Sequence, residues 1–196
     1  MLKKIHIGYD FIILLSLLIF FDDDNIMLFF IVSAFVHELA HLFAFLLCGA
    51  KIERISLSCM GANITLAEFP MLSYLREALC ILCGPLANFL LSFICYLSGF
   101  YLLAGINIIL CVFNLIPASR FDGGRIIMLF CQRFFTYRTA YTVLGVLSFL
   151  SVIAIIPPGI YLLILTKYNV SLLLAGCFLL FSMYFDYFRG AVWIKN

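Results

Sequence analysis

Two histidines and a glutamate lie in an apolar stretch of the chain, where residues 35–43 read FVHELAHLF. If this stretch is helical, His37 and His41 are four residues apart and share one face. The pattern HExxH on a helix is typical of two zinc-binding imidazoles, with the glutamate beside the attacking water. His37 and His41 are therefore predicted to be zinc ligands, and Glu38 is predicted to lie beside the metal-bound water.

A catalytic zinc site takes a third protein ligand and keeps one open position, and few residues could supply that ligand. The other histidine of the sequence is His6, near the start of the chain. Asp122 follows an apolar run in FNLIPASRFDGG, where Pro117 ends regular helix and the two glycines permit a tight turn. An unwound segment there would return Asp122 to the depth of the histidines. Asp122 is therefore preferred over His6.

The composition places these residues in a membrane. Of the 196 residues, 66% are hydrophobic and 11% are charged, and the mean hydropathy is +1.19. Soluble domains are about half apolar and about a quarter charged. We expect an all-α polytopic membrane protein with one integral-membrane domain over residues 1–196. The net charge of +2 is too small to indicate nucleic acid, and no nucleic-acid partner is expected.

Six apolar runs are candidate transmembrane helices. A span needs about 20 apolar residues, or somewhat fewer where the bilayer adapts. The first run is short and is interpreted as a retained span, not a cleaved signal. The fifth contains Pro157 and Pro158, which predict a kink or an early end. The six runs cover residues 8–21, 26–48, 78–98, 104–119, 140–164 and 169–186.

Basic residues predict the orientation, because lysine and arginine favour cytoplasmic loops. With the N-terminus inside, every basic residue except Lys167 lies on the inner side. Both termini are therefore expected in the cytoplasm, and the metal site is expected to open to the same side.

A short β-hairpin is predicted on the cytoplasmic side, between the second and third spans. In KIERISLSCMGANITLAEF, apolar and polar residues alternate on both sides of MGAN, which predicts a turn containing Gly61. After Asp122, the sequence RIIMLFCQRFFTYR is typical of an interfacial segment.

The polar residues in the second span are also compatible with roles other than proteolysis. Polar side chains join helices inside membranes, bind heme or line transport pathways. A transporter would need further polar groups across the bilayer, and the predicted spans carry few. A pseudoprotease should have lost Glu38 or a ligand. The alternative is a non-proteolytic zinc-binding membrane protein, either a pseudoprotease or a metal transporter.

Three motifs together resemble the site-2 protease family of intramembrane zinc metalloproteases. They are HELAH at residues 37–41, GPLAN at residues 84–88 and NLIPASRFDGG at residues 114–124. The resemblance covers nearly the whole chain and is closest to the sporulation-type branch, which releases a sigma factor from its pro-sequence. The C-terminal CBS domain of that branch is not expected in this chain. The chain also has Arg120 where the family often has a proline.

The resemblance implies a metalloendopeptidase. It would hydrolyse a peptide bond in or near the transmembrane segment of a membrane-associated protein, by zinc-activated water. By resemblance, His37, His41 and Asp122 bind Zn²⁺. Glu38 is then the catalytic acid and base.

Substrate binding is also implied by the resemblance. Asn114 would hold the substrate or the unwound loop, and the hairpin with Gly61 would dock the substrate as an added strand. Asn88 would polarise the substrate, and an interhelical hydrogen bond is given equal weight for it. A pro-sigma or anti-sigma factor in a bacterial cell membrane is the expected kind of substrate. A regulatory membrane partner is left open.

Overall fold

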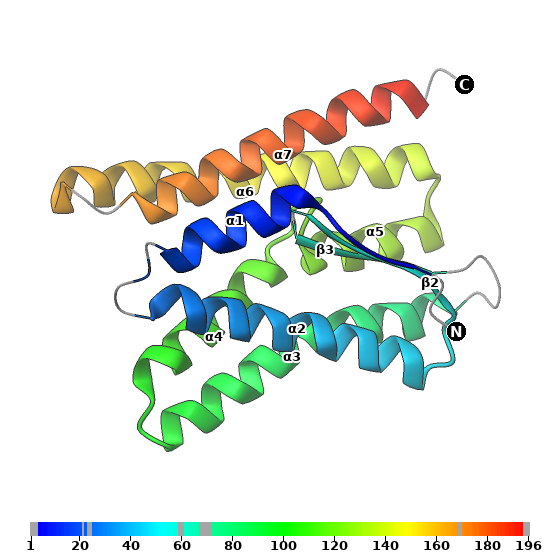
Figure 1. Ribbon diagram of the computed structural model, residues 1–196. Coiled ribbons are helices and arrows are strands. Elements are labelled where there is room, and N and C mark those ends of the chain that lie inside the picture. Colours follow the sequence, from blue (N-terminus) through cyan, green and yellow to red (C-terminus); the bar gives the residue numbers. More distant parts are fainter. Residues whose placement is uncertain are drawn as a thin grey trace. The chain divides into compact units, whose positions relative to one another are not determined.

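The computed structural model describes residues 4–20, 22, 25–58, 61–66, 72–167 and 170–193. Within these residues the chain forms seven helices and one small sheet (Figure 1). Its internal contacts divide it into two compact units, Met1–Phe113 and Asn114–Asn196.

The first unit is built around two long apolar helices that pack side by side, α2 (Ile26–Leu47) and α3 (Tyr74–Leu97). They confirm the second and third predicted spans as helices. Asp22 caps α2, because its carboxylate accepts hydrogen bonds from the amides of Met27 and Leu28 at 3.0 and 2.8 Å. These bonds satisfy two of the amides that a helix leaves free in its first turn.

Two shorter helices complete the helical part of this unit, α1 (Tyr9–Phe20) and all but the last two residues of α4 (Tyr101–Leu115). The fourth predicted span runs to residue 119, but α4 ends at Leu115. Pro117 lies just beyond, and a proline restricts the residue before it to non-helical backbone. The end of this prediction is therefore corrected by four residues.

The predicted hairpin is present as β2 (Ile52–Ser58) and β3 (Gly61–Leu66), which pair antiparallel. The predicted turn is misplaced, because Gly61 already faces Ser58 in the ladder and belongs to β3. Cys59 and the methionine after it lie outside the described residues.

A third strand was not predicted. β1 (Lys4–Ile7) pairs parallel with β2, so the sheet order is β1-β2-β3.

The second unit consists of α5 (Asp122–Phe134), α6 (Tyr137–Thr166) and α7 (Ser171–Trp193). α6 and α7 lie side by side along much of their length (Figure 1). Buried Ala118, Val152 and Leu179 form a small core here. The predicted interfacial segment after Asp122 is the separate helix α5.

Pro157 and Pro158 lie inside α6 and do not end it. The expectation of an early end is therefore wrong. Each proline removes one helical hydrogen bond, but tight packing on α7 holds this part of α6. A Cβ added to Gly159 would lie 2.9 Å from the backbone nitrogen of Leu173, so the two helices approach closely at this point.

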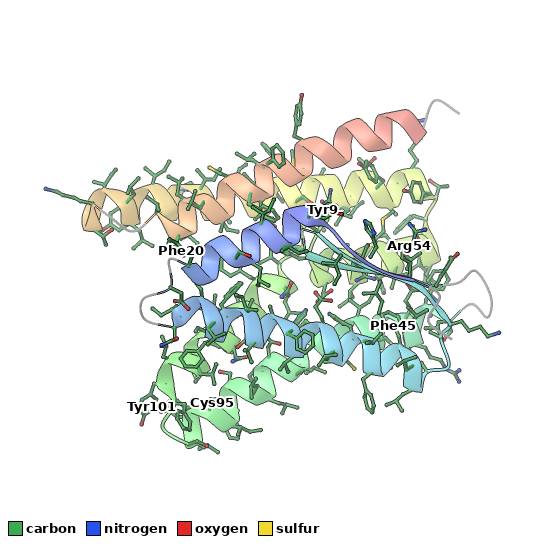
Figure 2. The ribbon with its side chains drawn as sticks, in the orientation of Figure 1. Tyr9, Phe20, Phe45, Arg54, Cys95 and Tyr101 are labelled. Carbon is green, nitrogen blue, oxygen red and sulfur yellow. The ribbon has the colours of Figure 1, made fainter. Side chains whose placement is uncertain are left out.

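Three helices, α2, α3 and α6, are long and apolar enough to cross a membrane, among the residues described. α4 and residues 171–181 are shorter apolar helices. Large apolar side chains project outward from the helices (Figure 2). Phe45 is an exception, with an exposed fraction of 1%. Extensive exposed apolar surface is typical of contact with a membrane, and the count of six spans stays a prediction.

Candidate metal centre

α2 presents His37 and His41 on one face, as their spacing predicts. Both imidazoles are buried, with exposed fractions of 5% and 3%. Their Nε2 atoms lie 3.1 Å apart, and the ring planes meet at 85°. Two nitrogens bound to one tetrahedral zinc at ~2.0–2.1 Å are about 3.3 Å from each other. The pair therefore fits a shared zinc ion.

The orientation of His41 is set by a backbone carbonyl of the neighbouring helix. Its Nδ1 lies 3.0 Å from the carbonyl oxygen of Cys80 on α3. A carbonyl can only accept, so Nδ1 carries the proton and donates. In the neutral ring, Nε2 then keeps its lone pair and directs it toward His37. Metal-binding histidines commonly donate their other ring nitrogen in this way.

Gly84 keeps the space in front of both imidazoles open. A Cβ built at this position would lie 2.8 Å from Nε2 of His37 and would also collide with Nε2 of His41. Any other residue would therefore place a carbon where a metal ion between the two nitrogens must sit. This contact gives a physical reason for the glycine in GPLAN.

Glu38 follows His37 directly in α2 and is half-buried. Successive residues of a helix are turned by about 100°, so Glu38 flanks the face that carries the histidines. A carboxylate in this position can exchange a proton with a molecule held at the histidine pair.

Asp122 is the first residue of α5 in the second unit, and its side chain is buried, with an exposed fraction of 6%. The backbone between Leu115 and Asp122 is not helical, which agrees with the unwound segment predicted from the sequence. The amide of Ser119 is tied to Ser148 Oγ on α6 at 3.2 Å. Asp122 also lies 3.9 Å from the guanidinium of Arg125. The helix N-terminus and this cation both supply positive potential to the carboxylate.

The two glycines after Asp122 let this loop fold onto the start of α5. A Cβ on Gly123 would lie 2.7 Å from the carbonyl oxygen of Ile116, and a Cβ on Gly124 would collide with the carbonyl of Ala118. Both positions therefore exclude a side chain. The sequence predicted a tight turn here, and the contacts supply its cause.

The remaining predicted site residues, Asn88, Asn114 and Gly61, belong to three different elements. Asn88 is on α3, one turn after Gly84, and is fully buried. No hydrogen bond to its amide is present among the described residues, so the interhelical hydrogen bond considered for Asn88 is not found. Asn114 is half-buried near the end of α4, and Gly61 begins β3.

His6, the alternative third ligand, is exposed on β1 and faces Ser56 in the sheet. It is not part of any cluster of potential metal ligands among the described residues.

Comparison with known proteins establishes the family. A sequence model of peptidase family M50 matches residues 25–103 and 97–156, which is more than half of the chain. The chain belongs to peptidase family M50. The match includes His37, Glu38 and His41 in its first segment and Asp122 in its second.

A zinc metalloprotease of Methanocaldococcus jannaschii is 31% identical to this M50 chain over 118 residues. The alignment covers 54% of the chain and 34% of the relative, so the chain matches about a third of that protein's length. The name of this relative states both the metal and the proteolytic activity that HExxH predicts.

A solved structure, the site-2 protease from Methanocaldococcus jannaschii, has the same fold. It superimposes with a TM-score of 0.65 at 25% sequence identity, and covers 92% of the M50 chain and 88% of the solved chain. The resemblance to site-2 proteases is thereby confirmed. This family is membrane-embedded, which agrees with the apolar helices α2, α3 and α6.

Proposed function

We propose that this M50 chain is an intramembrane zinc metalloprotease. Its reaction is hydrolysis of a peptide bond in or near the transmembrane segment of a membrane-associated protein. The observation that carries the proposal is the pair of converging Nε2 atoms on α2, 3.1 Å apart, with the space before them kept clear by Gly84. Family M50 and the named zinc metalloprotease relative support it.

Zinc would be held by His37, His41 and Asp122. All three side chains are buried and are of types that could hold a metal ion. Two imidazoles and one carboxylate make a three-ligand set of the kind found in catalytic zinc sites, which keep a fourth position for a reactant. The unwound loop and the two glycines after Asp122 support its assignment as the third ligand.

Glu38 supplies the proton transfers in the proposed reaction. When bound, zinc supplies Lewis acidity, which activates water at neutral pH and polarises a carbonyl group. Glu38 removes a proton from the attacking water and delivers it to the nitrogen of the leaving amine. The Cys80 carbonyl keeps His41 in the tautomer whose Nε2 carries a lone pair that can bind the metal.

The sheet has a strand edge on which an unwound segment of the substrate could form hydrogen bonds. A helical substrate hides its peptide groups in internal hydrogen bonds, and an open strand edge can replace those bonds. β1 and β3 occupy both edges of β2. We place the substrate on the open edge of β3, which starts at Gly61 and has six residues against four in β1. Asn114, which is half-buried near the end of α4, would contact the bound segment.

The biological setting proposed is a bacterial cell membrane, with both termini and the opening of the site on the cytoplasmic side. The distribution of basic residues supports this orientation. A pro-sigma or anti-sigma factor is the proposed substrate, on the basis of the resemblance to the sporulation-type branch. A membrane protein that regulates cleavage would fit the same setting.

The substitution Glu38→Gln tests the proposed chemistry. It removes the proton acceptor but neither imidazole. We expect zinc content and unfolding to stay as in the unmodified protein, while cleavage falls roughly 10²–10⁴-fold. The measurement combines metal analysis of the purified protein with cleavage of a panel of fluorescent single-span peptides in lipid nanodiscs.

Glu77→Gln on α3 is the matched control, because it makes the same chemical change outside the metal centre. It should cleave normally. A Glu38→Gln protein that cleaves at the unmodified rate would contradict the assignment. An unmodified protein that holds zinc but cleaves none of the peptides would favour the pseudoprotease or transporter alternative.

A further inference from the structure

Two asparagines of the first unit are fully buried and have amide atoms that no described residue pairs. Asn88 on α3 and Asn107 on α4 both have an exposed fraction of 0%. Within the described part of the chain, neither amide atom of Asn88 has a hydrogen-bond partner, and Oδ1 of Asn107 has none. Buried polar groups are nearly always paired with protein or ordered water. These three atoms therefore indicate a ligand.

The orientation of Asn107 shows what that ligand must do. Its Nδ2 donates to Ser33 Oγ at 3.0 Å and to the carbonyl oxygen of Leu103 at 2.9 Å. A carbonyl only accepts, so the nitrogen must lie on that side. Oδ1 therefore faces the other way and needs a donor. Asn88 needs both a donor and an acceptor.

The unpaired amides lie in one layer of the first unit. α2 and α3 run in opposite directions (Figure 1), and Gly84 on α3 lies against both His41 and His37 on α2. One turn further along α3 is Asn88, and one turn back along α2 is Ser33, the partner of Asn107. This layer is therefore about 6 Å along α2 from His37, at a rise of ~1.5 Å per residue.

We propose that Asn88, Asn107 and Ser33 form an internal water-binding site between α2, α3 and α4. Water has two donors and two acceptors. It can donate to Oδ1 of each asparagine and accept from Nδ2 of Asn88. Buried waters typically make about three hydrogen bonds to otherwise unpaired groups, and three unpaired atoms are present. One or two molecules satisfy them all.

The site holds water inside the helical layer, one turn away from the histidine pair. It lies toward the end of α2 that begins at Ile26. This hydration site does not depend on proteolysis, because it follows from burial and hydrogen bonding in the first unit. A non-proteolytic form of the protein would retain it.

A structure of the full chain in lipid, at a resolution that shows ordered water, tests the site directly. We expect density about 2.7–3.2 Å from Oδ1 of Asn107 and from the amide of Asn88. Amides that bond each other or another protein group, with no water between them, would overturn the proposal.

Unfolding of variants gives a second test. We expect Asn88→Leu and Asn107→Leu each to lower the unfolding midpoint, and the double variant to lose less than the sum of the two. The reason is that either substitution already leaves the shared water short of partners. Asn107→Leu combined with Thr142→Val on α6 is the control, and those two losses should add. Additive losses for the two asparagines would contradict a shared water.

Discussion

At residue 84, the absence of a side chain decides whether two imidazoles can share a cation. His37 and His41 were identified from their spacing alone, because positions four apart on a helix share a face. The glycine opposite them lies in the GPLAN motif, but its steric role could be found only from contacts between α2 and α3. The same holds for the Cys80 carbonyl that orients His41. Residues that act through a neighbouring helix leave no periodic signal in the sequence.

Gly84→Ala should weaken zinc binding by roughly 10–100-fold, a range typical of changes around metal ligands. The added methyl group would occupy the space in front of both Nε2 atoms. Zinc affinity can be measured by competition with a chelator. Gly105→Ala on α4 is the matched control, because a Cβ there meets nothing within 4 Å. Unchanged zinc affinity in Gly84→Ala would mean that the metal does not lie between the imidazoles.

Asp122→Ala should lower the zinc content of the purified protein, since it removes the proposed third ligand. Arg125→Gln is the control, because it removes the ion pair of Asp122 with Arg125 at 3.9 Å but keeps the carboxylate. A pair this exposed and this long contributes little, so Arg125→Gln should keep its zinc. Full zinc occupancy in Asp122→Ala would assign the third ligand to another group.

At the scale of elements, local residue patterns predicted the helices and strands that depend mainly on neighbouring residues in the sequence. Alternating residues predicted β2 and β3, and apolar runs predicted α2, α3 and α6. β1 was missed because its partner strand is distant in sequence, with Lys4 facing Arg54. A four-residue strand carries too little alternation to be recognised without that partner. α6 passes through its prolines for a similar reason, since its support comes from α7.

The open edge of β3 can be tested with two adjacent prolines. Neighbouring amides of a strand point to opposite sides, and proline has no amide hydrogen. Ala62→Pro and Asn63→Pro therefore remove one outward amide and one amide of the β2–β3 ladder. We expect one variant to lose cleavage while zinc content and the unfolding midpoint stay unchanged, and the other to be destabilised. If neither variant loses cleavage selectively, the substrate does not add to β3.

At the scale of the whole molecule, the parallel pairing of β1 with β2 constrains the path of the chain. Residues 4–7 and 52–58 belong to one sheet, so α1 and α2 must lead away from the sheet and return to it (Figure 1). The N-terminal segment and the hairpin therefore share one end of the first unit. The basic residues predicted the same arrangement independently, by placing both on the cytoplasmic side.

Reporter fusions at each terminus test the predicted orientation. A reporter that functions only in the cytoplasm should be active at both ends, since the basic residues other than Lys167 fall on the inner side. Activity at the N-terminus alone would require an odd number of crossings. It would also place the end of α7 on the outer face.

The same strand pairing sets an order of events during synthesis. β1 leaves the ribosome about 50 residues before the part of β2 that it faces. At roughly 5–20 residues per second, β1 waits about 2.5–10 s for its partner. α1 and α2 are made within that interval. The sheet can therefore close only after the first two helices have emerged, and until then the nascent β1 must be kept from pairing with other chains.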